Sequence, residues 1–307
     1  MIHSFAITNY LGDRIKIDLR KPEVSGFLIK SVTGLGPVKA TVNTMEVVTN
    51  DGSMFNSARL SQRNIVFQIV FVDTVYGETI EDVRQKTYKY FPAKKNVEIV
   101  IETDNRYVRT SGYVESNEPD IFSSQEGTSI SIICPDPFFY SAGADENNIV
   151  DFHSIDSMFE FPFSNESLTE PLLVFGEIRI NTEGVITYHG DAEIGVTIYI
   201  HAIGPASNIS VYNKETKEVM KIDTIKLQKL TGKGIVESDD IIINTSKGDK
   251  SITLIREGIS YNILNCSDKN TDWFTLVKGD NIFAFTADSG ITNLQFRIEN
   301  KVTYEGV

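Results

Sequence analysis

Apolar and polar residues alternate in many short segments along the chain. The alternation is clearest at residues 15–19, 97–102, 129–133, 196–200 and 251–255. Because successive side chains of a strand point to opposite faces, each of these segments predicts a strand with one buried face. Clusters of Gly, Asn, Asp and Ser, which favour turns, separate them. The pattern therefore predicts a mainly β protein that folds as a sandwich or a barrel.

One segment departs from this pattern and predicts a helix over residues 79–91. Thr79 is followed three positions later by Asp82, which is the arrangement that caps a helix N-terminus. Apolar residues then recur at helical spacing, and Pro92 ends the segment because proline has no backbone N–H to donate. We expect this helix to pack on the sheet of an N-terminal domain.

A proline-rich stretch divides the chain. In CPDPFFY, at residues 134–140, two prolines within three residues interrupt both helices and sheet ladders. Small polar residues that are typical of a linker follow it. We therefore predict an N-terminal domain at residues 1–140, a linker at 141–170 and a C-terminal domain at 171–307. A chain of 307 residues is long enough for two such domains.

Composition narrows the range of partners. Hydrophobic residues make up 41% and charged residues 23% of the chain, as in ordinary globular proteins. The 29 Lys and Arg against 42 Asp and Glu give a net charge of -13, which disfavours nucleic acids and anionic membranes as partners. The longest apolar run, residues 65–72, is too short to span a bilayer, and the N-terminus lacks the features of a signal peptide. We expect a protein that is made in the cytoplasm.

Candidate catalytic and metal-binding groups form no recognisable motif in the sequence. None of the four histidines lies in an HExxH pattern, and no phosphate-binding or nucleophile motif is present. No further catalytic or metal-ligating residue accompanies the acid pairs Glu81–Asp82 and Asp239–Asp240 in a recognisable pattern. Cys134 ends an apolar strand, where a buried and inert thiol is expected. We predict that the chain is not an enzyme and holds no metal and no cofactor.

The aromatic residues leave one alternative open. Trp273 is the single tryptophan and lies between turn clusters. Its position suits either a stacking platform for a sugar or a core aromatic of a sandwich. The core role is favoured, because sugar sites generally need several exposed aromatic residues. We also expect Tyr76, Tyr88, Tyr90 and Tyr107 to be packing residues.

Several stretches, taken together and in order, resemble the distal tail (Dit) proteins of tailed phages and of related phage tail-like particles. They are spread over nearly the whole chain, and the most specific is the CPDPFF stretch, which resembles the end of the family's first domain. The stretches are ARLSQRNIVF at 58–67, FPAKK at 91–95, RTSGYVE at 109–115, ISIICPDPFF at 130–139, WFTLVKGDN at 273–281 and YEGV at 304–307.

The resemblance implies a fold and a structural role. It implies an N-terminal, barrel-like β domain with one helix and a hairpin arm, followed by a C-terminal galectin-like β-sandwich. Family members form a ring, usually a hexamer, in the tail tip or baseplate of the virion. The ring joins the tail tube protein to the tail hub protein, and in many phages it anchors receptor-binding proteins or side fibres. Such a protein is synthesised in the cytoplasm of the bacterial host.

Residues 42–60 have the pattern expected of the arm. Asn50-Asp51-Gly52 favours a tight turn. Apolar residues flank this turn, namely Met45, Val47, Val48, Met54 and Phe55. We predict that these five residues contact a neighbouring subunit, because a single monomer would cover them poorly. An ordinary hairpin packed on its own domain is the alternative.

The alternative function is a carbohydrate-binding module that recognises bacterial surface glycans. A galectin-like sandwich suits such a role, and Trp273 is the candidate contact residue. However, a chain of 307 residues leaves no space for an inserted carbohydrate-binding module. The two functions predict different behaviour, because a ring adaptor forms a stable homo-oligomer whereas a glycan module binds cell walls as a monomer or small oligomer.

Overall fold

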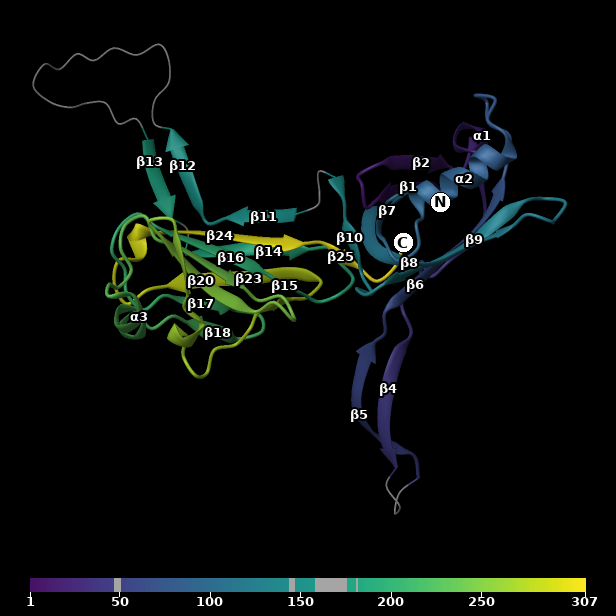
Figure 1. Ribbon diagram of the computed structural model, residues 1–307. Coiled ribbons are helices and arrows are strands. Elements are labelled where there is room, and N and C mark those ends of the chain that lie inside the picture. Colours follow the sequence, from purple (N-terminus) through teal and green to yellow (C-terminus); the bar gives the residue numbers. More distant parts are fainter. Residues whose placement is uncertain (47–50, 144–146, 158–175, 181) are drawn as a thin grey trace, which may run out of the picture. The chain divides into compact units, whose positions relative to one another are not determined.

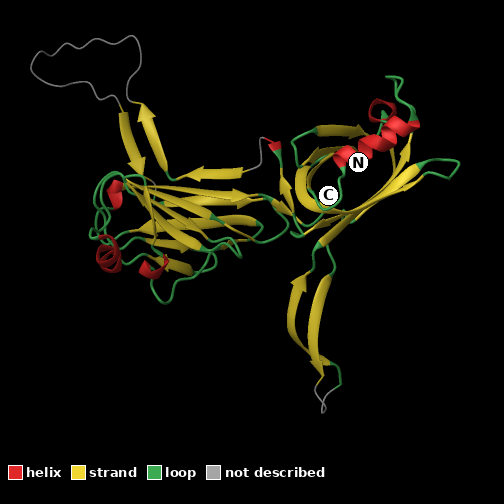
Figure 2. Cartoon of the chain, in the orientation of Figure 1, coloured by secondary structure: helices red, strands yellow, loops and turns green. Residues whose placement is uncertain are grey.

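The computed structural model shows a mainly β protein, as the alternating pattern predicts (Figures 1 and 2). It forms two compact units, one of Met1–Glu146 with Thr303–Val307 and one of Asn147–Val302. Among the described helices, none combines the length and the apolar character that a membrane span requires. The structure describes residues 1–46, 51–143, 147–157, 176–180 and 182–307.

The first unit is built on a nine-stranded antiparallel sheet. Its strands are Ile2–Asn9 (β1), Arg14–Asp18 (β2), Phe27–Thr33 (β3), Arg63–Phe71 (β6), Asn96–Thr103 (β7), Tyr107–Asp120 (β8), Gly127–Cys134 (β9), Phe139–Ser141 (β10) and Thr303–Tyr304 (β25). The main order is β2-β1-β7-β8-β9-β6-β3, while β10 pairs with β8 and with β25.

This sheet is open in the described part of the chain, because its end strands β2 and β3 do not pair with each other. The barrel-like closure implied by the resemblance is therefore not found. A one-turn helix, Pro22–Ser25 (α1), connects the two end strands instead. Its C-cap Gly26 packs closely on the side chain of Val83, which would lie 2.6 Å from a Cβ at that position. The single helix expected in this domain is thus joined by a second, shorter one.

The predicted helix is confirmed as Ile80–Tyr90 (α2). Thr79 and Asp82 cap it reciprocally: the Asp82 N–H donates to the Thr79 hydroxyl, and the Thr79 N–H donates to the Asp82 carboxylate at 2.9 Å. The helix packs on one face of the sheet around a core of aromatic rings (Figure 1). Phe67 lies at its centre, with ring centroids 5.3 Å from Phe5 and 6.3 Å from Phe91.

The second unit contains two larger sheets and two short strand pairs. The six-stranded sheet has the order Asn147–Asp151 (β11), Leu294–Lys301 (β24), Thr197–Ala202 (β16), Asp240–Asn244 (β19), Ser251–Arg256 (β20) and Ile259–Asn262 (β21). The four-stranded sheet has the order Glu183–Tyr188 (β14), Gly279–Thr286 (β23), Ser210–Asn213 (β17) and Glu218–Lys221 (β18). His153–Ser157 (β12) pairs with Gly176–Ile180 (β13), and Ile194–Gly195 (β15) pairs with Thr275–Leu276 (β22). The helical segments are Thr224–Thr231 (α3), Leu264–Cys266 (η2) and Ile291–Asn293 (η3).

The two larger sheets enclose one hydrophobic core, which makes this unit a β-sandwich. Phe285 of β23 stacks on Phe296 of β24, with ring centroids 3.4 Å apart, and so links the two sheets. The alternating segments at 196–200 and 251–255 correspond to β16 and β20. The galectin-like character of this sandwich stays a prediction.

The chain enters the second unit after β10 and returns to the first unit as β25. These two short strands pair with each other, so the second unit is an insertion between neighbouring strands of the first. The last five residues, assigned to the C-terminal domain from the sequence, therefore lie in the first unit. Strand β11, which falls within the predicted linker, belongs to the second unit. Residues 144–146 and 158–170 of that linker, and residues 171–175 after it, lie outside the described residues.

Candidate functional site

A hairpin arm is the most distinctive surface of the first unit. It consists of Ala40–Glu46 (β4) and Ser53–Leu60 (β5), which form a separate two-stranded sheet (Figure 1). All of its described residues are exposed, whereas β6, which follows it directly, is half buried. An isolated two-stranded hairpin is at best marginally stable in water. An arm of this kind would gain stability if a further surface covered it.

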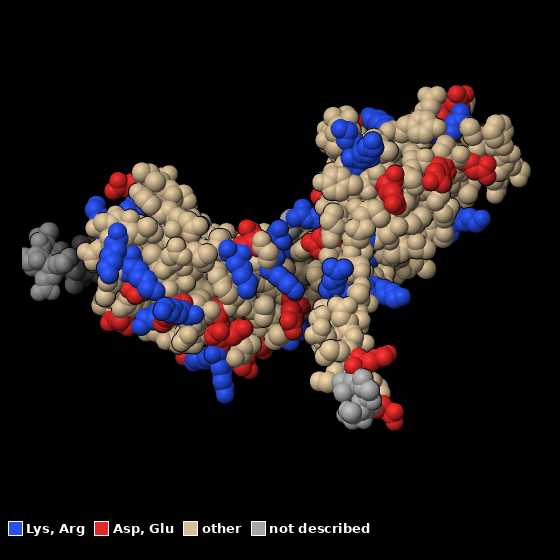
Figure 3. Space-filling model, turned by 60° about the horizontal axis from the view of Figure 1, so that its bottom comes forward, with Lys and Arg blue, Asp and Glu red and all other residues tan. Residues whose placement is uncertain are grey.

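The arm carries large apolar side chains in contact with solvent. Phe55 is 68% exposed, Met45 60% and Met54 59%, so three of the predicted contact residues are available to a partner. Met45 and Met54 lie directly opposite each other across the hairpin. Val47 and Val48 lie outside the described residues. Figure 3 shows few charged side chains along the arm, apart from acidic ones beside its tip.

Arg63, the first residue of β6, fixes the base of the arm. Its side chain is fully buried, with its guanidinium 4.2 Å from the ring centroid of Phe139. The carbonyl oxygens of Gly36, Pro137 and Glu305 accept hydrogen bonds from it at 2.7–2.8 Å, and that of Gly34 accepts another. Burial lowers the pKa of Arg63.

The acceptors of Arg63 come from three distant segments of the chain. Gly34 and Gly36 precede β4, Pro137 lies in the predicted domain boundary, and Glu305 lies in the returning C-terminal segment. The Val307 N–H also donates to the Leu35 carbonyl at 3.1 Å. The residues on both sides of the arm are thus held against the C-terminal segment. In the sequence, Arg63 stands out only as part of a stretch that resembles the Dit family, since an isolated arginine gives no signal of burial.

A second exposed apolar surface, here called the rim, lies in two loops of the same unit. Its residues are Val75 and Tyr76, after β6, and Ile121 and Phe122, between β8 and β9; Phe122 is 97% exposed. The Phe71 N–H at the end of β6 donates to the Glu126 carbonyl, so both loops lie at the same end of the sheet. The expected packing role of Tyr76 is wrong, because its loop leaves the side chain in solvent.

Two of the candidate catalytic side chains from the sequence, Asp239 and Cys134, are buried in the fold. Asp239 is fully buried and accepts two hydrogen bonds from Arg256, at 2.7 and 2.6 Å, whereas its neighbour Asp240 is half-buried beside His201. Cys134 is buried, as predicted, and burial raises the pKa of its thiol. Within the described residues, no three His, Cys, Asp or Glu side chains lie close enough together to hold a metal ion.

Comparison with known proteins identifies the fold. No family model and no curated protein sequence matches the chain. The crystal structure of the Dit protein of phage SPP1 matches with a TM-score of 0.59 and 12% identity, over 97% of this chain and 98% of that chain. The chain has a Dit-like fold. The SPP1 protein is described as a paradigm of the hub adsorption apparatus in phages that infect Gram-positive bacteria.

Two structures of the phage P2 baseplate in its activated conformation, one with Ca and one with Sr, also match over nearly the whole chain. Their TM-scores are 0.42 and 0.39, each at 14% identity. The match to SPP1 Dit confirms the resemblance at the level of the fold. It includes both units, because it covers almost the full length of either chain.

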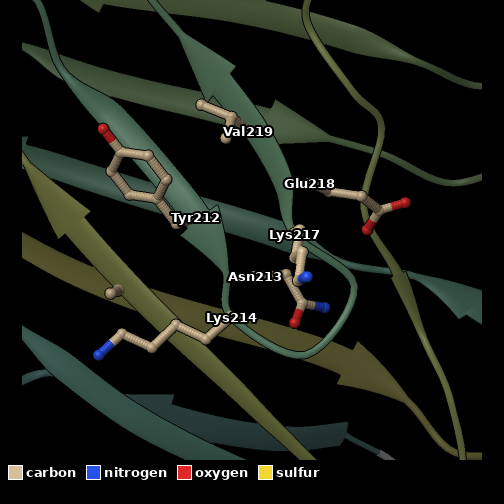
Figure 4. A pocket seen from close by; sticks show the side chains of 7 residues that line it. Tyr212, Asn213, Lys214, Lys217, Glu218 and Val219 are labelled. Carbon is tan, nitrogen blue, oxygen red and sulfur yellow. The ribbon is translucent and has the colours of Figure 1, made fainter.

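The second unit of this Dit-like fold has an open hollow of about 560 Å³ on its four-stranded sheet. Figure 4 shows Tyr212 and Lys214 extending to one side of β17. The buried Asn213 accepts a hydrogen bond from the Glu215 N–H at 3.0 Å, while its Nδ2 has no partner among the described residues. The lining residues are Tyr212, Asn213, Lys214, Lys217, Glu218, Val219 and Ala284.

Trp273, the predicted sugar contact, does not line this hollow. It is partly buried and packs against the core of the sandwich. The Lys250 ammonium lies 5.1 Å from its ring centroid, so one face of the indole is partly occupied. The structure therefore places Trp273 in a packing position, and its role as a glycan contact stays a prediction.

Proposed function

We propose that this protein is a structural adaptor of a phage tail tip or baseplate and assembles with copies of itself into a ring. The observation that carries the proposal is the exposed apolar arm on a Dit-like fold. The arm has no covering surface on its own unit in the described residues, and association between copies would remove its apolar side chains from water. The adaptor acts by shape and contact, without catalysis.

The partners follow from the resemblance and from the SPP1 protein's description as part of a hub adsorption apparatus. The ring, a hexamer in this proposal, joins the tail tube protein to the tail hub protein. It also provides anchoring points for receptor-binding proteins or side fibres. The protein is made in the bacterial cytoplasm and is incorporated into the virion tail.

The solution mass tests the proposal. Six copies of 34.3 kDa would give about 206 kDa by light scattering coupled to size-exclusion chromatography. Replacing the arm, residues 40–60, by a short Gly-Ser linker should shift the mass to that of a monomer. The far-UV circular dichroism spectrum should still be that of a folded, mainly β protein. A wild-type chain that is monomeric at every concentration, or an arm-less chain that still assembles, would contradict the proposal.

Glycan binding is the second candidate function, and the hollow beside Tyr212 is the observation that favours it. Sugars bind where an aromatic ring lies beside polar groups, and here Tyr212 neighbours Asn213 and Lys214. Pull-down with purified cell walls provides the test. Tyr212→Ala should abolish binding, and Trp273→Ala should leave it intact if the hollow is the site. Retention of wild-type binding by Tyr212→Ala would reject this site.

A further inference from the structure

The segment from Lys214 to Lys233 in the second unit is basic, although the chain as a whole is acidic. It contains six lysines and three acidic residues, whereas the whole chain has a net charge of -13. The segment forms the turn after β17, then β18 and α3. One of its acids, Asp223, caps α3 by accepting hydrogen bonds from the Ile225 and Lys226 N–H groups. A local excess of positive charge therefore borders the hollow.

Two lysines of this segment present free ammonium groups. Lys214 forms an ion pair with Glu183, whereas the ammonium groups of Lys217 and Lys221 have no partner in the described part of the chain. Lys217 also has a left-handed backbone conformation, with φ at 61°, which glycine adopts with less strain. A charged side chain at this turn lowers stability slightly and leaves a cation in solvent beside the hollow.

The free lysines flank an apolar floor. Tyr212 lies directly opposite Val219 on β18 and Ala284 on β23, so the three side chains share one face of the sheet. Lys221 follows Val219 by two positions and shares this face, while Lys217 lines the hollow just before β18 (Figure 4). The Cα atoms of the two lysines lie roughly 13 Å apart, at about 3.3 Å per residue. A half-buried tyrosine ring thus lies beside two separated positive charges.

We infer that this surface, here called the basic strip and made of Tyr212, Lys217, Val219 and Lys221, binds an anionic glycan. The ligand is a polymer of sugars or polyols that carries phosphate or carboxylate groups. The inference rests on the glycan binding proposed above as the second candidate function and adds the charge of the ligand. A lysine ammonium is a point charge that pairs with either anion, and the tyrosine ring offers a flat apolar surface to a sugar. Nucleic acids are disfavoured, because their dense charge would extend beyond the strip onto the acidic remainder of the chain.

Titration calorimetry with four soluble polymers tests the class of ligand. The probes are poly(glycerol phosphate), a polyuronate, uncharged β-1,4-linked N-acetylglucosamine oligomers and an RNA oligonucleotide. We expect one or both of the anionic glycans to bind tightest, and the tighter of the two identifies the anion. Raising the NaCl concentration from about 50 to about 200 mM should weaken this binding by about fivefold or more, because binding releases counterions.

The outcomes separate this inference from the function on which it rests. Tightest binding of the uncharged oligomers would overturn the anionic ligand and leave glycan binding standing. Tightest binding of RNA would overturn the choice of a glycan. Failure of all three glycan probes to bind would contradict the second candidate function itself.

A matched pair of double variants tests the basic strip. Lys217→Gln with Lys221→Gln removes two charges from the strip, and Lys247→Gln with Lys250→Gln removes two from the turn after β19. None of the four side chains is buried, so both variants should unfold at the wild-type temperature. We expect the strip variant to bind the anionic glycan about tenfold or more weakly and the control variant about twofold at most.

Charge retention gives the second control. Lys217→Arg with Lys221→Arg keeps both positive charges and should keep the affinity and its salt dependence. The Gln strip variant should lose most of the salt dependence. An equal loss of affinity in the strip variant and in the Lys247–Lys250 control would overturn the assignment of the ligand to the strip, because net charge alone would then explain the binding.

Discussion

At the scale of single residues, Arg63 has the clearest structural role. All of its described hydrogen bonds go to backbone carbonyl oxygens, and the segments that supply them are up to 242 positions away. It follows the polar residues Ser61 and Gln62 at the start of β6, and nothing in this local sequence indicates burial. Burial arises only because three loops converge on the guanidinium. No local pattern reveals such long-range convergence, so the sequence could not identify this residue by its own chemistry.

Replacing Arg63 should destabilise the first unit. Arg63→Met would leave four carbonyl oxygens without the buried guanidinium that donates to them, and we expect a loss of about 3 kcal/mol in the free energy of unfolding. Arg63→Lys should lose less, because an ammonium keeps the charge but lacks the planar fork of donors. Urea unfolding followed by circular dichroism measures both. A wild-type midpoint for Arg63→Met would show that the carbonyl contacts contribute little.

At the scale of elements, the spacing of Thr79 and Asp82 predicts the N-terminal cap of α2, and the contribution of this cap to stability can be tested. Thr79→Ala removes the hydroxyl that accepts from the Asp82 N–H, and we expect a loss of about 1 kcal/mol in stability. Hydrogen bonds from Thr79 lower the pKa of Asp82. Their stabilisation is therefore present above the ordinary Asp pKa and disappears as the pH falls through the lowered one.

The titration of Asp82 tests the predicted role of the Thr79 cap. In Thr79→Ala, the pKa of Asp82, followed by NMR of its carboxyl carbon, should rise toward the ordinary value. Thr79→Ser keeps a hydroxyl at the same position and serves as the matched control, with the lowered pKa retained. Unchanged titration of Asp82 in Thr79→Ala would mean that the bonds to Thr79 do not cause the lowered pKa.

Elements with a local signal could be predicted, whereas their pairing could not. Alternation identifies β7 and β9, and the Thr79–Asp82 spacing identifies α2, because each depends on residues within one short segment. Helix α1 is only one turn long and gives too short a periodic signal. The register of the arm shifts between Asn43 and Thr44, and because this shift depends on two strands, a single-strand pattern does not show which residues share a face with Phe55. The apolar flanks of the arm are visible in the sequence, whereas the pairing of Met45 with Met54 is not.

At the scale of the whole molecule, the insertion of the second unit links the C-terminal segment to the arm. The segment Thr303–Val307 pairs with β10, donates to Leu35 and supplies the Glu305 carbonyl to Arg63. Tyr304 also packs under the Arg106 guanidinium, which lies 4.4 Å from its ring centroid and donates to the Gly306 carbonyl. The end of the inserted unit therefore leads directly into the structure that holds the arm's base.

Ending the chain at Val302 tests this link. The variant loses the partly buried Tyr304 ring and the hydrogen bonds of Glu305, Gly306 and Val307, and we expect the first unit to lose about 3 kcal/mol of stability. The second unit keeps its whole core, so its unfolding should not change. Amide hydrogen exchange should rise at Leu35 and neighbouring residues, which lose their anchor. Tyr304→Phe, which keeps the ring, should behave like wild type, and equal exchange at Leu35 in the shortened chain would show that the arm's base holds without the C-terminal segment.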